Sequence, residues 1–226
     1  MAPTYVIPFV LYLLGTAFIA RFGDKNYPIC YTAVAVVVGG SILYLLRGKE
    51  ILKPHLRVGW GVAAGLVGIA LWIVLCHLHL EKQLTSLLPE FLRERVEPAE
   101  RVGYNPFEHL SAGFQVWSFI AVRLIGIAVL VPIAEELFWR GFLLRWLIDP
   151  EWEKIKLGEY THHSCAIVVL MFTVAHPEWF AAASYCLLIN GLLYWKKDLW
   201  QCVVAHAVSN LVLAIYVLQT GYWWLW

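Results

Sequence analysis

The sequence has little charge, no excess of charge of one sign and no pattern of paired cysteines. Lys, Arg, Asp and Glu make up 15% of the 226 residues, and the formal net charge is +1, whereas a soluble domain is usually about one quarter charged. A net charge so close to zero gives no argument for a nucleic-acid partner. The five cysteines are odd in number and form no CxxC pair, which favours buried thiols over a disulfide or metal framework.

Apolar residues take the place of the missing charge. They make up 61% of the chain, and the mean hydropathy is +0.67. The runs 3–20, 29–46 and 58–80 can each cross a hydrocarbon core of about 30 Å at about 1.5 Å per residue. Because lipid cannot satisfy unpaired backbone groups, such runs are expected to be helices. Together with later apolar runs, they predict an all-α polytopic membrane bundle of about seven to eight transmembrane helices.

Charges between the runs predict how the chain is oriented. No basic segment precedes the first run and no clear cleavage site follows it, so it is expected to be a retained helix and not a signal peptide. The loop at 47–57, RGKEILKPHLR, has four Lys/Arg against one Glu. The positive-inside rule predicts that this loop and the N-terminus are cytoplasmic.

The least hydrophobic segment, 81–110, separates two parts of the chain. Its leucines recur at helical spacing among charged residues, with a break at Pro89, which is typical of an interfacial amphipathic element. A surface connector is favoured there over a regulatory or gating role. We therefore divide the chain into N-terminal membrane helices with this segment, 1–110, and a core, 111–226.

Two adjacent glutamates and an arginine lie within the apolar run VPIAEELFWRGFLLRW. Ionisable groups at the centre of a membrane helix cost about 2.5–3.5 kcal/mol each, so they are functional candidates by default. Glu136 and Arg140 are i,i+4 neighbours and can pair. Glu135 points about 100° away from Glu136. The pattern predicts a structural Glu136–Arg140 pair and a free Glu135, although simple neutralisation of both glutamates by nearby arginines is the alternative.

Three more polar residues lie in apolar segments further along. His176 follows FTVA, and His206 and Asn210 share one helix face in HAVSN. Each has a structural alternative, as an interfacial histidine or as interhelical hydrogen bonding. Taken together with Glu135, they are the parts of a hydrolytic site, with a carboxylate as general base and the other groups positioning water or an oxyanion. No GxSxG motif indicates a serine nucleophile, and no cysteine lies next to a candidate base in the sequence.

EELFWR, FTVAH and HAVSN resemble the EExxxR, FxxxH and HxxxN/D motifs of the CAAX prenyl protease and bacteriocin-processing (CPBP, ABI) family of intramembrane proteases. The resemblance covers about 111–226. It implies an endopeptidase of about eight membrane helices with a cavity open to the cytoplasmic side. Glu135 would activate water with help from His176, and His206 with Asn210 would stabilise the oxyanion. The resemblance assigns supporting roles to the remaining motif positions, Glu136, Arg140 and Phe172.

The first and last motifs also look similar to CAAX-protease-related proteins that accompany bacterial exosortase sorting systems. That branch implies the bacterial inner membrane, with lipid and a protein or peptide substrate as partners. The chain has no HExxH motif, and a metal-free mechanism is favoured. If zinc is used, Glu135, His176 and His206 would be its ligands. The alternative functions are a non-catalytic scaffold or immunity-type factor of the same fold, and a small-molecule carrier.

Overall fold

The computed structural model describes residues 2–19, 21–97 and 103–226, which form helices and connecting loops with no strand in these ranges. The helices in chain order are α1 (Ala2–Ile19), α2 (Tyr27–Leu46), α3 (Gly59–Leu78), α4 (Leu80–Thr85), α5 (Glu90–Val96), α6 (Pro106–His109), α7 (Gly113–Ile125), η1 (Gly126–Leu130), α8 (Val131–Glu136), η2 (Leu137–Leu143), α9 (Leu144–Trp146), η3 (Trp152–Lys154), α10 (His162–Val174), α11 (Trp179–Lys196), α12 (Leu199–Thr220) and η4 (Trp223–Leu225).

Among the described residues, five helical segments are long and apolar enough to cross a membrane. They are Ala2–Ile19, Tyr27–Leu46, Gly59–Thr85, Gly113–Trp146 and Leu199–Thr220. The shorter α10 and the more polar α11 pack beside them, with α11 against both α3 and α10. The chain is therefore a polytopic helical membrane protein, as its composition predicts.

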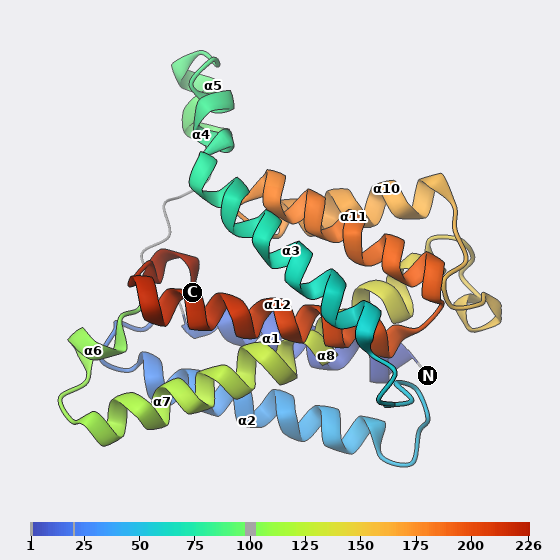
Figure 1. Ribbon diagram of the computed structural model, residues 1–226, viewed down its shortest axis with the longest axis horizontal. Helices are drawn as coiled ribbons and strands as arrows, with labels where there is room; N and C mark the ends of the chain where they lie inside the picture. The colour runs from blue at the N-terminus through green and yellow to red at the C-terminus, as the bar shows by residue number, and fades with distance from the viewer. Residues whose placement is uncertain (1, 20, 98–102) are drawn as a thin grey trace.

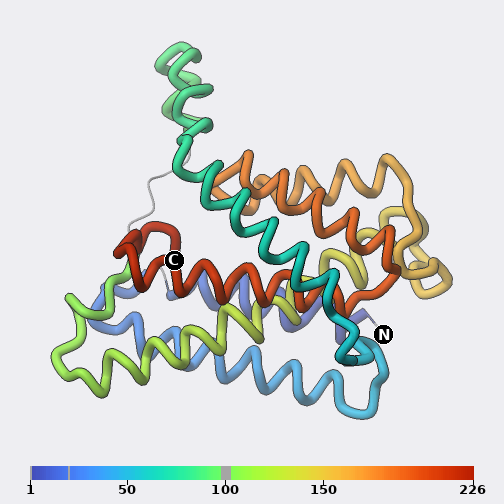
Figure 2. Tube along the Cα trace, in the orientation of Figure 1, coloured from blue at the N-terminus to red at the C-terminus, as the bar shows by residue number. Residues whose placement is uncertain are grey.

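The long helices run back and forth between two ends of the molecule (Figure 1). The N-terminus, the α2–α3 loop and the α11–α12 turn lie at one end, which we call the basic end because it contains residues 47–57. The α1–α2 turn, α6 and the C-terminal segment lie at the other end, which we call the far end. The tube in Figure 2 shows the same reversal of direction from one helix to the next.

A helical arm, α4 and α5, continues from α3 and projects from the bundle (Figure 1). α4 ends at Thr85 and Pro89 is the N-cap residue of α5, so the predicted break at this proline is confirmed. No residue of α5 is buried. The base of the arm is fixed to the bundle, because the Glu81 carboxylate accepts a 3.0 Å hydrogen bond from the Phe180 amide in the first turn of α11. An interfacial position for the arm stays a prediction.

The segment Gly113–Trp146 is not a uniform α-helix. It contains two π-helical stretches, η1 and η2, on either side of α8. Pro132 lies in the first turn of α8, which continues directly from η1, so its missing N–H leaves a carbonyl of the preceding turn without a backbone donor. π-helical turns widen a helix locally and occur frequently at functional sites. Here the two stretches flank the helix that carries Glu135 and Glu136.

Candidate active site

One cavity of about 180 Å³ brings the predicted site residues together. Glu135 enters it from α8, His176 from the turn after α10, and His206 and Asn210 from α12. The remaining lining residues come from both parts of the chain: Tyr12, Ile69, Trp72, Ile127, Val131, Phe172, Glu178, Tyr185, Ser209, Leu213 and Leu225. Groups that follow Glu135 by 41 to 75 positions in the sequence therefore meet it at one place in the bundle.

Glu136 lies beneath the cavity in a buried charged pair. Its Oε1 is 3.1 Å from Nη1 of Arg140, and neither side chain has any exposed surface. The predicted pairing is confirmed. The same Oε1 is 2.9 Å from Nδ1 of His206, which was not predicted. A histidine 70 positions away thus shares the carboxylate oxygen that neutralises Arg140.

Arg140 is held on its other sides by two further helices. Its Nε donates a 3.0 Å hydrogen bond to Oδ1 of Asn190 on α11. Its guanidinium carbon lies 5.4 Å from the centroid of the Phe172 ring on α10, a cation–π contact. Asn190 is fully buried. The Glu136–Arg140 pair therefore joins α8, η2, α10, α11 and α12 around the cavity.

Phe172 connects this charged pair with His176. Its ring stacks on the imidazole at a centroid distance of 4.5 Å. The His176 Nδ1 lies 2.8 Å from the Phe172 carbonyl oxygen, so Nδ1–H is the donor in this bond. In a neutral imidazole, Nε2 is then the acceptor. The ring is fixed in position and tautomer, with Nε2 left to accept a hydrogen bond or a proton.

His206 is oriented in the same manner by a carboxylate. It is 6% exposed, and its Nδ1–H donates to Glu136, as the 2.9 Å distance shows. The edge of the Tyr185 ring packs against it at a centroid distance of 5.8 Å. The Nε2 atom has no hydrogen-bond partner in the described part of the chain, so it is the ring nitrogen that can serve the cavity.

Asn210 is fixed by a hydrogen bond to a backbone carbonyl of η1 that has no backbone donor. The Val131 amide donates to the Gly126 carbonyl, five residues earlier. In the same π register the Ile127 carbonyl would accept from position 132, but Pro132 has no N–H. Nδ2 of Asn210 donates to this carbonyl instead, at 2.7 Å. One amide hydrogen of Asn210 is used for this interhelical bond, and the second is left for the cavity.

Glu135 makes none of the contacts that hold the adjacent Glu136. It lines the cavity and is 8% exposed, whereas Glu136 is 0% exposed. No hydrogen bond or ion pair to the Glu135 carboxylate forms within the described residues. The predicted division between a paired Glu136 and a free Glu135 is thus present in the structure.

A metal site was also considered, with Glu135, His176 and His206 as ligands. Within the described ranges, no group of three or more His, Cys, Asp or Glu side chains has an arrangement that could hold a metal ion. Nδ1 of each histidine already contacts a protein oxygen. We therefore derive no chemical step through a metal.

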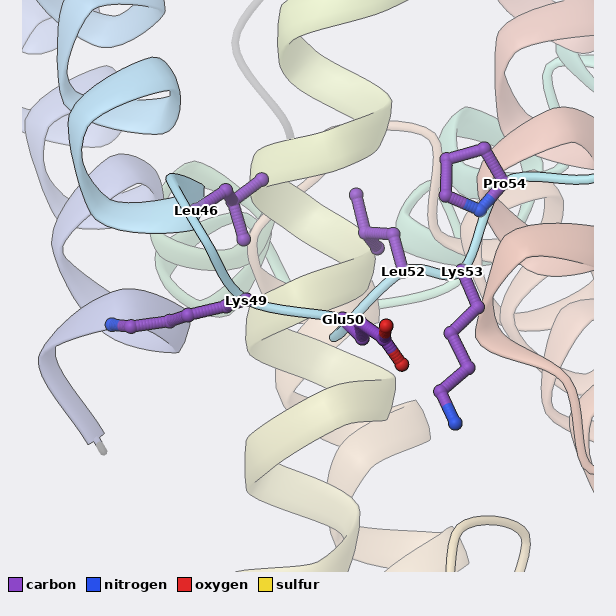
Figure 3. A pocket seen from close by; sticks show the side chains of 6 residues that line it. All are labelled: Leu46, Lys49, Glu50, Leu52, Lys53 and Pro54. Carbon is purple, nitrogen blue, oxygen red and sulfur yellow. The ribbon is translucent and has the colours of Figure 1, made fainter.

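A second hollow lies at the basic end, away from the candidate residues. It has a volume of about 500 Å³ and is lined by Leu46, Lys49, Glu50, Leu52, Lys53 and Pro54 (Figure 3). All six residues belong to the end of α2 and the loop that follows it, and they supply no histidine. The cavity with the candidate residues is instead lined from the middle of the bundle, and η4 contributes Leu225 to it.

Comparison with known families shows what the second half of the chain is similar to. The family model described as type II CAAX prenyl endopeptidase Rce1-like matches residues 116–212, a stretch that includes all four predicted catalytic residues. This part of the chain is similar to CAAX proteases, and the similarity supports a CAAX-protease-like membrane endopeptidase. No curated protein and no solved structure matches the chain. The exosortase-associated branch stays a prediction.

Several residues of the site carry no sequence signal that would have revealed them. Tyr12, Trp72 and Tyr185 are aromatic residues within apolar runs, where the sequence does not distinguish a cavity-lining side chain from one that faces lipid. Asn190 is different, because an isolated polar residue in the apolar run at 179–195 is a sequence signal of a functional or packing role. Tyr12 and Trp72 also show that helices before residue 111 contribute to the cavity.

Proposed function

We propose that this chain hydrolyses a peptide bond within the membrane with a water molecule that Glu135 activates. The observation that carries the proposal is the convergence of Glu135, His176, His206 and Asn210 on one cavity from α8, the turn after α10 and α12. A carboxylate without a protein partner, beside two oriented imidazoles and an amide, matches the groups that amide hydrolysis requires.

The reaction would begin with proton transfer from water to Glu135. The water oxygen attacks the carbonyl carbon of the scissile bond, while Nε2 of His176 accepts a hydrogen bond from the same water and orients it. The fixed Nδ1 contact of His176 supports this role, because it leaves Nε2 as the acceptor. The proton held by Glu135 then passes to the leaving nitrogen as the carbon–nitrogen bond breaks.

His206 and Asn210 would stabilise the oxyanion of the tetrahedral intermediate. Asn210 offers its second amide hydrogen, because the first is bonded to Ile127. As an imidazolium, His206 would donate a hydrogen bond to the oxyanion through Nε2–H. Its Nδ1–H would continue to donate to the Glu136 carboxylate. Removal of one fixed donor to a developing negative charge typically lowers kcat about 10²–10³-fold. Glu136 and Arg140 would act through His206, as positioning residues.

We propose a metal-free reaction in preference to a zinc-dependent one. Within the described residues no group of three or more His, Cys, Asp or Glu side chains has an arrangement that could hold a metal ion, which supports the preference. The substrate would be a protein or peptide reached from the lipid bilayer, and the cell membrane would be the bacterial inner membrane. A link to an exosortase sorting system is part of the same proposal and rests on resemblance alone.

The test is the Glu135→Ala variant expressed in cells that lack the chain. New N- and C-termini of membrane proteins are identified by mass spectrometry in cells with the wild-type chain, with the variant and with no chain. We expect the variant to reach the membrane in normal amounts and to produce none of the wild-type termini. Glu159→Ala, at an exposed position in the α9–α10 loop, is the control. Wild-type processing by Glu135→Ala would favour the scaffold alternative.

A further inference from the structure

Tyr12 is a cavity residue that lies outside every motif and outside the stretch that matches the family. It belongs to α1, which precedes the matched residues 116–212 by about one hundred positions. Its side chain nevertheless lines the cavity that contains Glu135, His176, His206 and Asn210. A polar group in this place needs an explanation that the matched core does not supply.

The packing of α1 holds Tyr12 beside the helix that carries the candidate base. Tyr12 packs against a buried cluster of Val38, Ile42 and Ala134, and Ala134 directly precedes Glu135. Tyr12 and Glu135 line the same cavity. Tyr12 thus lines the cavity from α1 while it packs against the helix that carries the candidate base.

The Tyr12 hydroxyl differs from the other hydroxyl groups of the cavity. The Tyr185 hydroxyl donates to Oγ of Ser209 at 3.0 Å, and Oγ of Ser209 lies 2.9 Å from the Gly65 carbonyl oxygen. The Tyr12 hydroxyl makes no hydrogen bond within the described residues. An unbonded phenol costs free energy in an apolar environment. A donor left unused in a catalytic cavity is available to a reacting group.

We propose that Tyr12 is a further catalytic residue, which donates a hydrogen bond to the carbonyl oxygen of the scissile peptide bond as that oxygen becomes an oxyanion. This inference rests on the proposed function. The phenol keeps its proton throughout, and no bond to Tyr12 forms or breaks. Tyr12 would thus act from α1 on the same oxygen that His206 and Asn210 stabilise from α12, so that the N-terminal helices complete the site.

Tyr12→Phe tests this role, because it removes the hydroxyl and keeps the ring that packs against α8. Tyr31→Phe is a matched control. Tyr31 shares a small apolar void of about 10 Å³ with Tyr12 but does not line the catalytic cavity. The substrate is a synthetic peptide that covers the cleavage site mapped by the comparison of termini. We expect Tyr12→Phe to lower kcat about 10²–10³-fold, as the loss of one oxyanion donor does, with KM and melting temperature unchanged.

The outcomes separate this inference from the proposed function. A Tyr12→Phe variant with wild-type kcat, beside an inactive Glu135→Ala variant, would overturn the role of Tyr12 and leave the protease proposal in place. An equal loss of kcat in Tyr31→Phe would also overturn it, since the effect would then come from packing in α1 and α2. An active Glu135→Ala variant would overturn the proposed function itself.

Discussion

Replacing Arg140 with methionine should destabilise the fold far more than the loss of a surface charge does. Arg140 is fully buried and bonded to Glu136 at 3.1 Å and to Asn190 at 3.0 Å. Arg140→Met would leave the Glu136 carboxylate buried with only His206 beside it. Removing one partner of a buried pair typically costs about 3–5 kcal/mol. Since about 1 kcal/mol shifts Tm by roughly 2–4 °C in a chain of this size, Tm should fall by roughly 6–20 °C.

The assay is thermal unfolding in detergent, followed by the fluorescence of the tryptophans. Arg93→Met is the control, because Arg93 and Glu97 form an exposed i,i+4 pair at 3.9 Å, and such pairs are worth about 0–1 kcal/mol. The double variant Glu136→Gln with Arg140→Met removes both buried charges and should recover part of the loss. If Arg140→Met costs less than about 1 kcal/mol, or if the double variant is less stable than the single one, the account of this pair is wrong.

Three further predictions concern the site and its orientation. Pro132→Ala should lower kcat about 10- to 100-fold without lowering Tm, because a restored N–H at position 132 can bond the Ile127 carbonyl and release Asn210. Both values are measured on one purified sample, kcat by enzyme kinetics and Tm by thermal unfolding. Dialysis against a chelator should leave the activity unchanged, and loss followed by recovery on zinc addition would contradict the metal-free proposal. The orientation is tested with a membrane-impermeant maleimide on intact cells, in a chain whose Cys30 and Cys165 are replaced by Ser. The reagent should label Tyr222→Cys but not Pro54→Cys, and the reverse pattern would contradict the charge-based orientation.

That last experiment decides between two expectations that conflict on this fold. The charge of residues 47–57 predicts that the basic end is cytoplasmic, whereas the family resemblance implies a cavity open to the cytoplasm. The cavity lining includes Leu225 of η4, at the far end, and no residue of that loop. If the cavity opens at the far end, the two expectations cannot both hold, and the labelling prediction above follows the charge.

The sequence predicted those features that depend on local spacing. Helical geometry alone separates Glu135 from Glu136, and the i,i+4 spacing of Glu136 and Arg140 predicts their pair. The long apolar runs predict the membrane bundle, because only helices satisfy their own backbone in lipid. These features need no knowledge of how one helix packs on another.

Contacts between distant helices could not be predicted in this way. The bond between His206 and Glu136 depends on how α12 crosses α8, and the bond from Asn210 to Ile127 depends on a π-helical turn in η1. Pro132 signalled an irregular helix, but not which carbonyl would lose its donor. Tyr12 had no signal, because a tyrosine in an apolar helix fits a lipid-facing position as well as a cavity.

The central claim is that Glu135 activates the attacking water while Glu136 supports the fold. Its most direct test is the single-turnover cleavage rate of purified Glu135→Gln, which keeps the size of the side chain and removes the base. We predict that cleavage of the mapped peptide is lost, with Tm within about 2 °C of wild type, a shift that corresponds to less than about 1 kcal/mol. Cleavage at the wild-type rate by this variant would contradict the account.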